Sequence, residues 1–231
     1  MAINIVVPTN GSGEDDTDGT TFTTGSVSYV AGRAYLIGVW TEAGYAQDMT
    51  SVAGGTASYT YRNGYRSAGT NGMIWVGEYV PAGSHSETVT ITVTVSTTRC
   101  QWCIVEITGA DNAALVVYSN YEATTGNTPS VTLNAFGDAT NNAAIGFFGI
   151  SQATTFTHDA AGGYAELYDA QAEASQTMAV QWKTGEDRAV GGTWGASSTI
   201  WSAAAEIKIA AAAGGSAITT QLTQHYRQLR I

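Results

Sequence analysis

One stretch of the chain, residues 87–118, constrains the fold more than any other. Between residues 89 and 95, valine and isoleucine alternate with threonine, which is the period of a strand with one buried face and one wet face. Threonine is β-branched and suits either face of a sheet. A polar break over residues 96–99 precedes a second apolar run over 100–108. We therefore predict that the two runs form a hairpin within an antiparallel sheet.

The rest of the chain repeats segments of this kind. Short apolar or alternating runs recur along the sequence, each bounded by glycine, asparagine, aspartate or serine, and residues 1–209 show no helical period of useful length. This pattern predicts an all-β fold, an antiparallel β-sandwich. Large aromatic side chains contribute strongly to such cores. We expect six tryptophans to be at least partly buried: Trp40, Trp75, Trp102, Trp182, Trp194 and Trp201.

A tyrosine-rich segment surrounds Asn63-Gly64, a dipeptide typical of a tight hairpin turn with positive φ angles. We expect the turn to lie at the surface. Tyrosines near it would then offer exposed aromatic faces for a ligand, with the Asn63 amide fixing its orientation. The candidate ligand-facing aromatics are Tyr59, Tyr61 and Tyr65. The alternative is a stacked surface hairpin without a ligand.

The charge and composition of the chain limit the kinds of partner that we expect it to bind. Charged residues make up only 12% of the chain, and the formal net charge is −10. Phosphate backbones would repel such a protein, so we expect no nucleic-acid partner. The first ten residues contain no basic segment followed by a long apolar run, and no stretch is apolar enough to span a bilayer. We therefore expect synthesis in a cytoplasm and no membrane association.

The two cysteines, Cys100 and Cys103, lie three residues apart on one predicted strand. Side chains at that spacing point to opposite faces, so they are poorly placed to form a disulfide or to share a metal. A structural zinc site would need about four ligands, and no second cysteine or histidine pair lies nearby. We predict that both are small buried hydrophobic residues.

An acidic cluster follows the first predicted strand, which covers residues 3–7. Its carboxylates resemble the start of a calcium loop, but the twelfth position, counted from Glu14, holds Gly25 instead of glutamate. We expect a solvated loop and leave a looser cation site open. The cluster consists of Glu14, Asp15, Asp16 and Asp18.

The chain lacks the common catalytic signatures: a nucleophile elbow, a zinc-protease helix and a phosphate-binding loop. His158-Asp159 could be half of a proton relay, but no nucleophile can be placed beside it. Glu106 and Glu206 each precede isoleucine a few residues after a tryptophan. We interpret them as parts of neighbouring strands in one sheet, with a paired-carboxylate glycosidase as an alternative. We expect that the chain is not an enzyme and that it binds no cofactor or metal.

The composition changes after Ile209. Residues 210–217 are small and spacer-like, and residues 218–231 carry apolar side chains at helical spacing and two arginines. We predict a β-sandwich domain over residues 1–209, beginning with an N-terminal strand and acidic loop (1–20), and a linker with a C-terminal docking tail over 210–231. The docking candidates are Tyr226, Arg227, Leu229, Arg230 and Ile231; the alternative is a frayed terminus.

Residues 35–208 resemble structural proteins of tailed bacteriophages. In that pattern an alternating Thr/Val strand precedes a strand ending in V-E-I-T-G-x-D, and a W-x-A-x-A-x-E-I-K run closes the domain. The matching residues are Val105, Glu106, Ile107, Thr108, Gly109, Asp111, the segments 131–136, 141–143 and 146–148, and the run 201–208. The resemblance implies a jelly-roll-like sandwich carried on a virion.

Within that class we expect a capsid decoration or head-fibre protein that binds the shell and sister subunits without catalysis. Its partners would be the major capsid protein or other virion proteins, together with sister copies in a homo-oligomer. It would be made in the host cytoplasm and act on the virion. The alternative is a carbohydrate-binding module of a tail fibre or receptor-binding protein, using the tyrosines near residue 63.

Overall fold

The computed structural model describes residues 2–42, 48–66, 72–172 and 175–211. These residues contain nineteen strands and no helix, and every strand pair is antiparallel. The predicted all-β, antiparallel fold is confirmed. No helix with the length and hydropathy of a membrane span occurs in the described part of the chain.

The first half of the chain forms one large sheet and two small ones. The large sheet has the order β1-β11-β5-β8-β7, and β2 also pairs with β11. Its strands are β1 (Asn4–Val6), β2 (Ser12–Asp15), β5 (Ala34–Glu42), β7 (Thr60–Arg66), β8 (Gly72–Tyr79) and β11 (Arg99–Thr108). The small sheets comprise β3 (Gly19–Thr23), β10 (Thr90–Thr97) and β6 (Met49–Ala53), and β4 (Val27–Tyr29) with β9 (His85–Glu87).

The second half forms a five-stranded sheet and a three-stranded sheet. The five-stranded sheet has the order β12-β19-β14-β17-β16. Its strands are β12 (Val116–Gly126), β14 (Ala143–Ile150), β16 (Ala165–Ala172), β17 (Gln176–Thr184) and β19 (Ser198–Ile207). The smaller sheet comprises β13 (Ser130–Thr132), β18 (Ala189–Trp194) and β15 (Phe156–His158).

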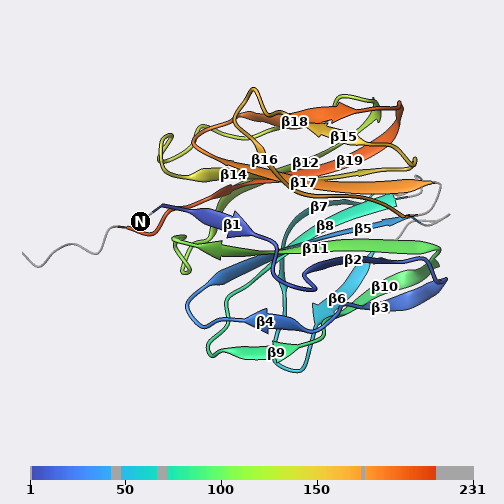
Figure 1. Cartoon of the computed structure of the whole chain (residues 1–231), viewed down its shortest axis with the longest axis horizontal. Coiled ribbons are helices and arrows are strands. Elements are labelled where there is room, and N and C mark those ends of the chain that lie inside the picture. The colour runs from blue at the N-terminus through green and yellow to red at the C-terminus, as the bar shows by residue number, and fades with distance from the viewer. Residues whose placement is uncertain (1, 43–47, 67–71, 173–174, 212–231) are drawn as a thin grey trace, which may run out of the picture.

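The sheets stack in layers, with the two large sheets in the middle and the small sheets outside (Figure 1). One apolar cluster fills the space between the large sheets, and two others fill the spaces between each large sheet and its small partners. Central strands are therefore covered on both faces. This is why β5 and β14 read as unbroken apolar runs without a polar face.

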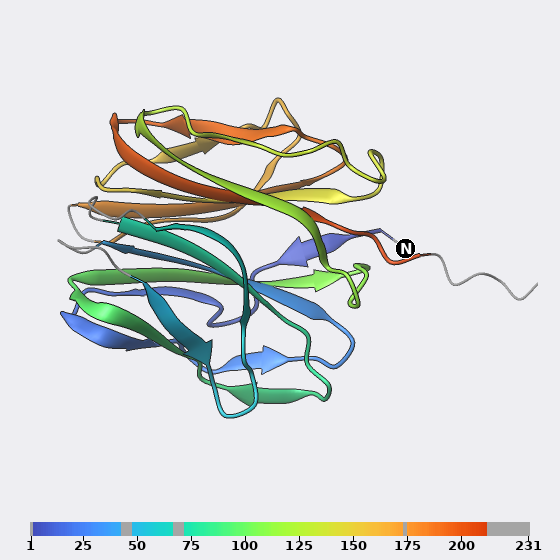
Figure 2. The same cartoon turned by 180° about the vertical axis from the view of Figure 1, so that it is seen from behind.

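Both halves use the same strand order. In the large sheets, β11-β5-β8-β7 corresponds to β19-β14-β17-β16, and in the small sheets β3-β10-β6 corresponds to β13-β18-β15. Each half also contacts the other through its edge strands. β7 of the first half lies against β12 of the second, and β16 of the second half lies against β2 of the first. The view from behind shows β12 passing next to β7 (Figure 2). Exchanging the halves maps one contact onto the other, as an approximate two-fold relation requires.

Glycines let the two large sheets interlock. A Cβ atom on Gly38 in β5 would lie 2.2 Å from Cδ1 of Phe147 in β14. A Cβ atom on Gly149 in β14 would in turn lie 2.5 Å from Cδ2 of Trp40 in β5. The Trp40 ring also contacts that of Trp201, with centroids 4.7 Å apart. An aromatic ring of each sheet thus occupies the space above a glycine of the other.

The predicted hairpin between residues 89–95 and 100–108 is wrong, although the alternation of its first strand is correct. Ile91 and Val93 are buried and Thr94 is exposed, as the period of two indicates. However, β10 pairs with β3 and β6, whereas β11 pairs with β1, β2 and β5. The polar break is therefore where the chain crosses from an outer sheet to a central one, with only Thr98 between the strands.

The acidic segment also differs from its prediction. Ser12–Asp15 is a strand that pairs with β11, so part of the expected loop belongs to a sheet. Asp15 accepts a hydrogen bond from the backbone N–H of Thr17 at 2.8 Å.

The partial burial of all six tryptophans is confirmed, with Trp182 the one that remains half-buried. The docking candidates at 226–231 lie outside the described residues.

Candidate functional site

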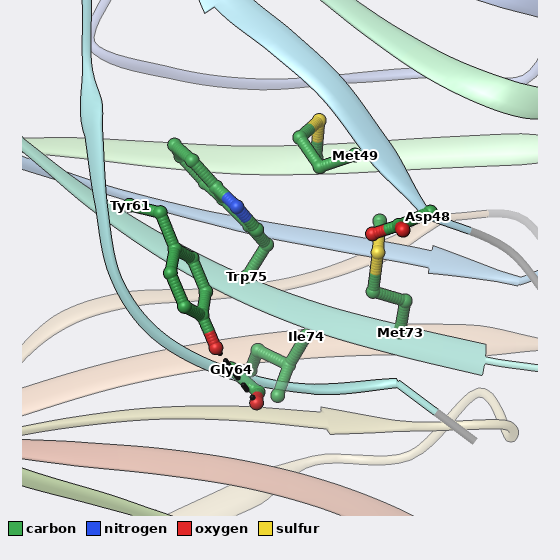
Figure 3. Close-up of a pocket in the computed structure, with 7 residues that line it drawn as sticks. All are labelled: Asp48, Met49, Tyr61, Gly64, Met73, Ile74 and Trp75. Atoms are coloured by element: carbon green, nitrogen blue, oxygen red, sulfur yellow. Dashed lines mark hydrogen bonds between the residues drawn. The ribbon is translucent and has the colours of Figure 1, made fainter.

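A pocket of about 330 Å³ opens between β6, β7 and β8. Apolar side chains dominate its lining, and Asp48 supplies a carboxylate. Figure 3 shows the rings of Tyr61 and Trp75 next to each other on one side, with Asp48, Met49 and Met73 on the other. A concave, mostly apolar site with few polar groups is the usual form of a small-molecule site.

Two aromatic rings form one wall of this pocket. The ring centroids of Tyr61 and Trp75 lie 6.0 Å apart with an interplanar angle of 36°. A Cβ atom on Gly77 would lie 2.2 Å from Cη2 of Trp75, so the indole packs directly over that glycine. The Tyr61 hydroxyl donates a hydrogen bond to the carbonyl of Gly64 at 3.3 Å. This bond orients a residue that is 53% exposed.

The Asn63-Gly64 dipeptide does not form the predicted turn. Both residues lie within β7, where Asn63 pairs with Val76 and Gly64 with Trp75, just after an irregularity in the register. A Cβ atom on Gly64 would lie 2.4 Å from the carbonyl oxygen of Ile74. Glycine is needed here because two backbones approach closely, a common reason for glycine at a β-bulge.

Asn63 ties the pocket to the second half of the chain. Its side-chain amide is buried and donates to the carbonyl of Asn120 in β12. The hydroxyl of Ser119 donates to the carbonyl of Arg62 at 3.3 Å. These bonds join β7 and β12, which are edge strands of the two large sheets.

This junction places Tyr121 near the pocket. Tyr121 is 46% exposed and belongs to β12. Partial burial raises the pKa of the Tyr61 hydroxyl, and the nearby Tyr121 and Asp48 raise it further. Two exposed tyrosines from opposite halves thus lie close together. Sequence reasoning missed Tyr121, because nothing in its local pattern marks β12 as the neighbour of β7.

The predicted ligand-facing tyrosines divide into three cases. Tyr61 lines the pocket, where a ligand-facing residue should lie. Tyr59 is only 6% exposed, and its hydroxyl lies 3.2 Å from that of Tyr29 within the core, so it cannot face a surface ligand. Burial accordingly raises the pKa of Tyr59 well above its ordinary value. Tyr65 lies in β7, but its side chain is outside the described structure.

The prediction that Glu106 and Glu206 lie on neighbouring strands of one sheet is wrong, because they belong to different sheets, and the structure does not bring them together as a carboxylate pair. They occupy equivalent places in the two halves, and each lies on the face of its strand directed away from the interface between the large sheets. The echo around them thus reflects the repeated topology and not two neighbouring strands. The tryptophans are not equivalent, since Trp102 packs in the outer cluster and Trp201 in the central one.

Each glutamate is held by neighbours in its own half. Glu106 accepts hydrogen bonds from Arg33 at 2.5 Å and from the Tyr35 hydroxyl at 2.8 Å. Glu206, only 1% exposed, accepts from the Asn142 amide at 2.6 Å. Buried carboxylates are normally paired with such donors. These hydrogen bonds explain Glu106 and Glu206 as structural residues.

No cluster of three or more His, Cys, Asp or Glu residues able to hold a metal occurs within the described ranges. Cys100 and Cys103 are both fully buried and belong to different apolar clusters, which confirms the predicted hydrophobic role. Burial raises the pKa of both thiols. His158 lies 3.3 Å from a carboxylate oxygen of Glu166.

Two further hollows lie elsewhere. One, of about 500 Å³, lies over β13, β15 and β18 and is lined by polar and small residues, His158 and Asp159 among them. The other, of about 320 Å³, lies beside Val117 and Ile209, near the end of the described chain. Of these three, the first pocket is the one whose lining includes tyrosine and tryptophan.

Comparison with known proteins finds no matching family model, no similar curated protein and no similar solved structure.

Proposed function

We propose that this chain is a structural protein of a tailed-phage virion, a capsid decoration or head-fibre protein that acts by binding and without turnover. Its partners are the major capsid protein, other virion proteins and sister copies in a homo-oligomer. The proposal also assigns each half to the jelly-roll type. It rests on the resemblance in residues 35–208 and on one structural observation, the nesting of the strand pairs.

The nesting is clearest in the second half, which has eight strands. The first pairs with the last (β12 with β19), the second with the seventh (β13 with β18), and the third with the sixth (β14 with β17). The first half nests in the same way through β1 with β11, β3 with β10, and β5 with β8. Double-sheet jelly rolls of eight strands are common in viral capsid and lectin domains.

The proposal is tested on the phage particles themselves. Quantitative mass spectrometry of gradient-purified particles should find the chain at a fixed ratio to the major capsid protein. Purified chain added to particles lacking it should bind to saturation at that ratio. If the chain is absent from particles and does not bind them, the proposal is wrong.

A second function, carbohydrate binding, is favoured by the pocket between β6, β7 and β8. Aromatic faces pack against the apolar C–H faces of sugars, and carboxylate and carbonyl oxygens accept hydrogen bonds from hydroxyl groups. Tyr61 and Trp75 supply the rings, and Asp48 supplies the carboxylate. The volume of about 330 Å³ is at the lower end of ligand sites, in the range of a mono- or disaccharide.

Titration of the isotope-labelled chain with neutral mono- and disaccharides tests this function. Amide NMR shifts should change around β6–β8, and Tyr61→Ala should weaken binding at least about tenfold, or ~1.4 kcal/mol. Val6→Ala is the control, since Val6 is 41% exposed but does not line the pocket. Equal weakening by both variants, or no shift with any sugar, would contradict the assignment.

A further inference from the structure

The pocket beside Val117 lies where the described chain ends. Val117, Ile209 and Ala211 line it, together with Asp138 and Lys208. Ala211 is the last described residue, and twenty more follow it in the sequence. The last described residue therefore lies at the pocket itself.

Val117 is exposed for a local structural reason. In β12, Val116 pairs with Ile207 and Tyr118 with Glu206, so Val117 is an extra residue at a bulge. The bulge turns its side chain out of the sheet, and it is 51% exposed. An apolar side chain held at the edge of a pocket favours an apolar occupant.

The chemistry of the following segment fits this pocket. Residues 212–217 are alanine, glycine and serine, and two glycines at 214 and 215 allow the chain to reverse. Ile218 and Leu222 then provide two branched apolar side chains. A cavity of about 150 Å³ already holds a benzene-sized group, so one of about 320 Å³ has room for two aliphatic side chains.

We propose that Ile218 and Leu222 of the same chain occupy this pocket and cover Val117. The six-residue spacer, at most ~20 Å long when extended, keeps the segment at an effective concentration on the order of millimolar. A segment so tethered reaches its own pocket more readily than that of another copy at ordinary protein concentrations. The proposal is independent of the virion and carbohydrate functions.

Such docking fixes where the distal tail begins. Residues 226–231, which carry the predicted docking side chains, would then project from one place on the second half.

The test compares full-length chains by methyl NMR. In the unaltered protein the Val117 methyl resonances should differ from those in Ile218→Ser/Leu222→Ser, because the substitutions would empty the pocket. The matched control is Tyr226→Ser/Leu229→Ser, which alters two other apolar residues of the tail and should leave Val117 unchanged. None of the substituted residues belongs to a described strand, so we expect the sandwich to stay folded in all three chains.

Three results would overturn the proposal. Identical Val117 resonances in the unaltered protein and the Ile218/Leu222 variant would show that the segment does not reach the pocket. A change in the control as large as in the variant would place a different part of the tail there. A Val117 shift that disappears on dilution, together with a falling light-scattering mass, would assign the pocket to a second copy.

Discussion

Gly38→Ala is the most direct test of how the two large sheets pack. The added Cβ would lie 2.2, 2.7 and 3.0 Å from three ring carbons of Phe147. Contacts under 3.0 Å do not persist, so either the ring or the strand must move. Phe147 is fully buried in the central cluster, and its ring cannot move without displacing neighbours.

The magnitude follows from two opposing effects. Overpacking a well-packed core typically costs about 1–3 kcal/mol, whereas replacing glycine by alanine in an extended segment recovers about 0.4–1 kcal/mol through the unfolded chain. We expect a net loss of about 1–2 kcal/mol. For a chain of 231 residues, each kcal/mol lowers Tm by about 2–4 °C.

Urea unfolding followed by tryptophan fluorescence measures this loss, since Trp40 and Trp201 lie in the same central cluster. Gly83→Ala is the matched control, because a Cβ there meets nothing within 4 Å and its φ angle is not positive. The control should be neutral or slightly stabilising. Combining Gly38→Ala with Phe147→Leu should cost less than the sum of the single changes, because the smaller side chain relieves the clash.

The reasoning would be refuted if Gly38→Ala were as stable as Gly83→Ala. It would also fail if the double variant showed no coupling. Either result would mean that β5 and β14 do not face each other as described.

Two further predictions concern buried groups. Cys100 and Cys103 should not react with an aromatic disulfide reagent in the native protein, and both should react in urea, because burial raises their pKa and blocks access; native reaction of either thiol would contradict the packing. Burial tends to raise the pKa of Glu87, but backbone N–H groups of Thr56 and Ala57 outweigh it and lower that pKa. Glu87 therefore stabilises the fold above its unfolded pKa of about 4.3, and this contribution is lost as pH falls through the lower folded pKa. Glu87→Gln should thus be less stable than the unaltered protein at pH 6 but nearly equal to it at pH 2–3 in urea titrations; a constant difference would refute this.

The sequence predicts local strand character well but not strand partners. The alternation over residues 89–95 correctly identifies the buried face of β10. A period of two reports burial and says nothing about which strand lies alongside. The pattern therefore predicts a hairpin where the chain in fact crosses between two sheets at Thr98. The same limit applies to Asn63-Gly64, where glycine serves a close approach between backbones and not a turn.

The candidate site was predictable only in part. Tyr61 stands out in the sequence because it flanks a dipeptide that is typical of tight turns. Tyr59 was indistinguishable from it by composition, and only the fold shows that Tyr59 faces the core. Tyr121 comes from a strand sixty residues away in the sequence, so its place beside Tyr61 depends on how the two halves pack.

The repeated topology has a consequence for how complementary the two large sheets can be. Glu106 pairs with Tyr35, and its counterpart Glu206 pairs with Ala144. Tyr35 and Ala144 therefore occupy equivalent positions in β5 and β14. Three residues after each of them lie Gly38 and Phe147, and five residues after each lie Trp40 and Gly149, so these two pairs are also equivalent positions.

These counterparts are the very residues that touch across the interface. In a dimer of identical chains, a residue near the symmetry axis meets its own copy, so glycine would face glycine and tryptophan would face tryptophan. One gap would be empty and the other overfilled. Joining both halves in one polypeptide removes that restriction, because each member of a self-facing pair can change alone. The small-against-large fit at the centre of this protein is therefore one that exact symmetry would forbid.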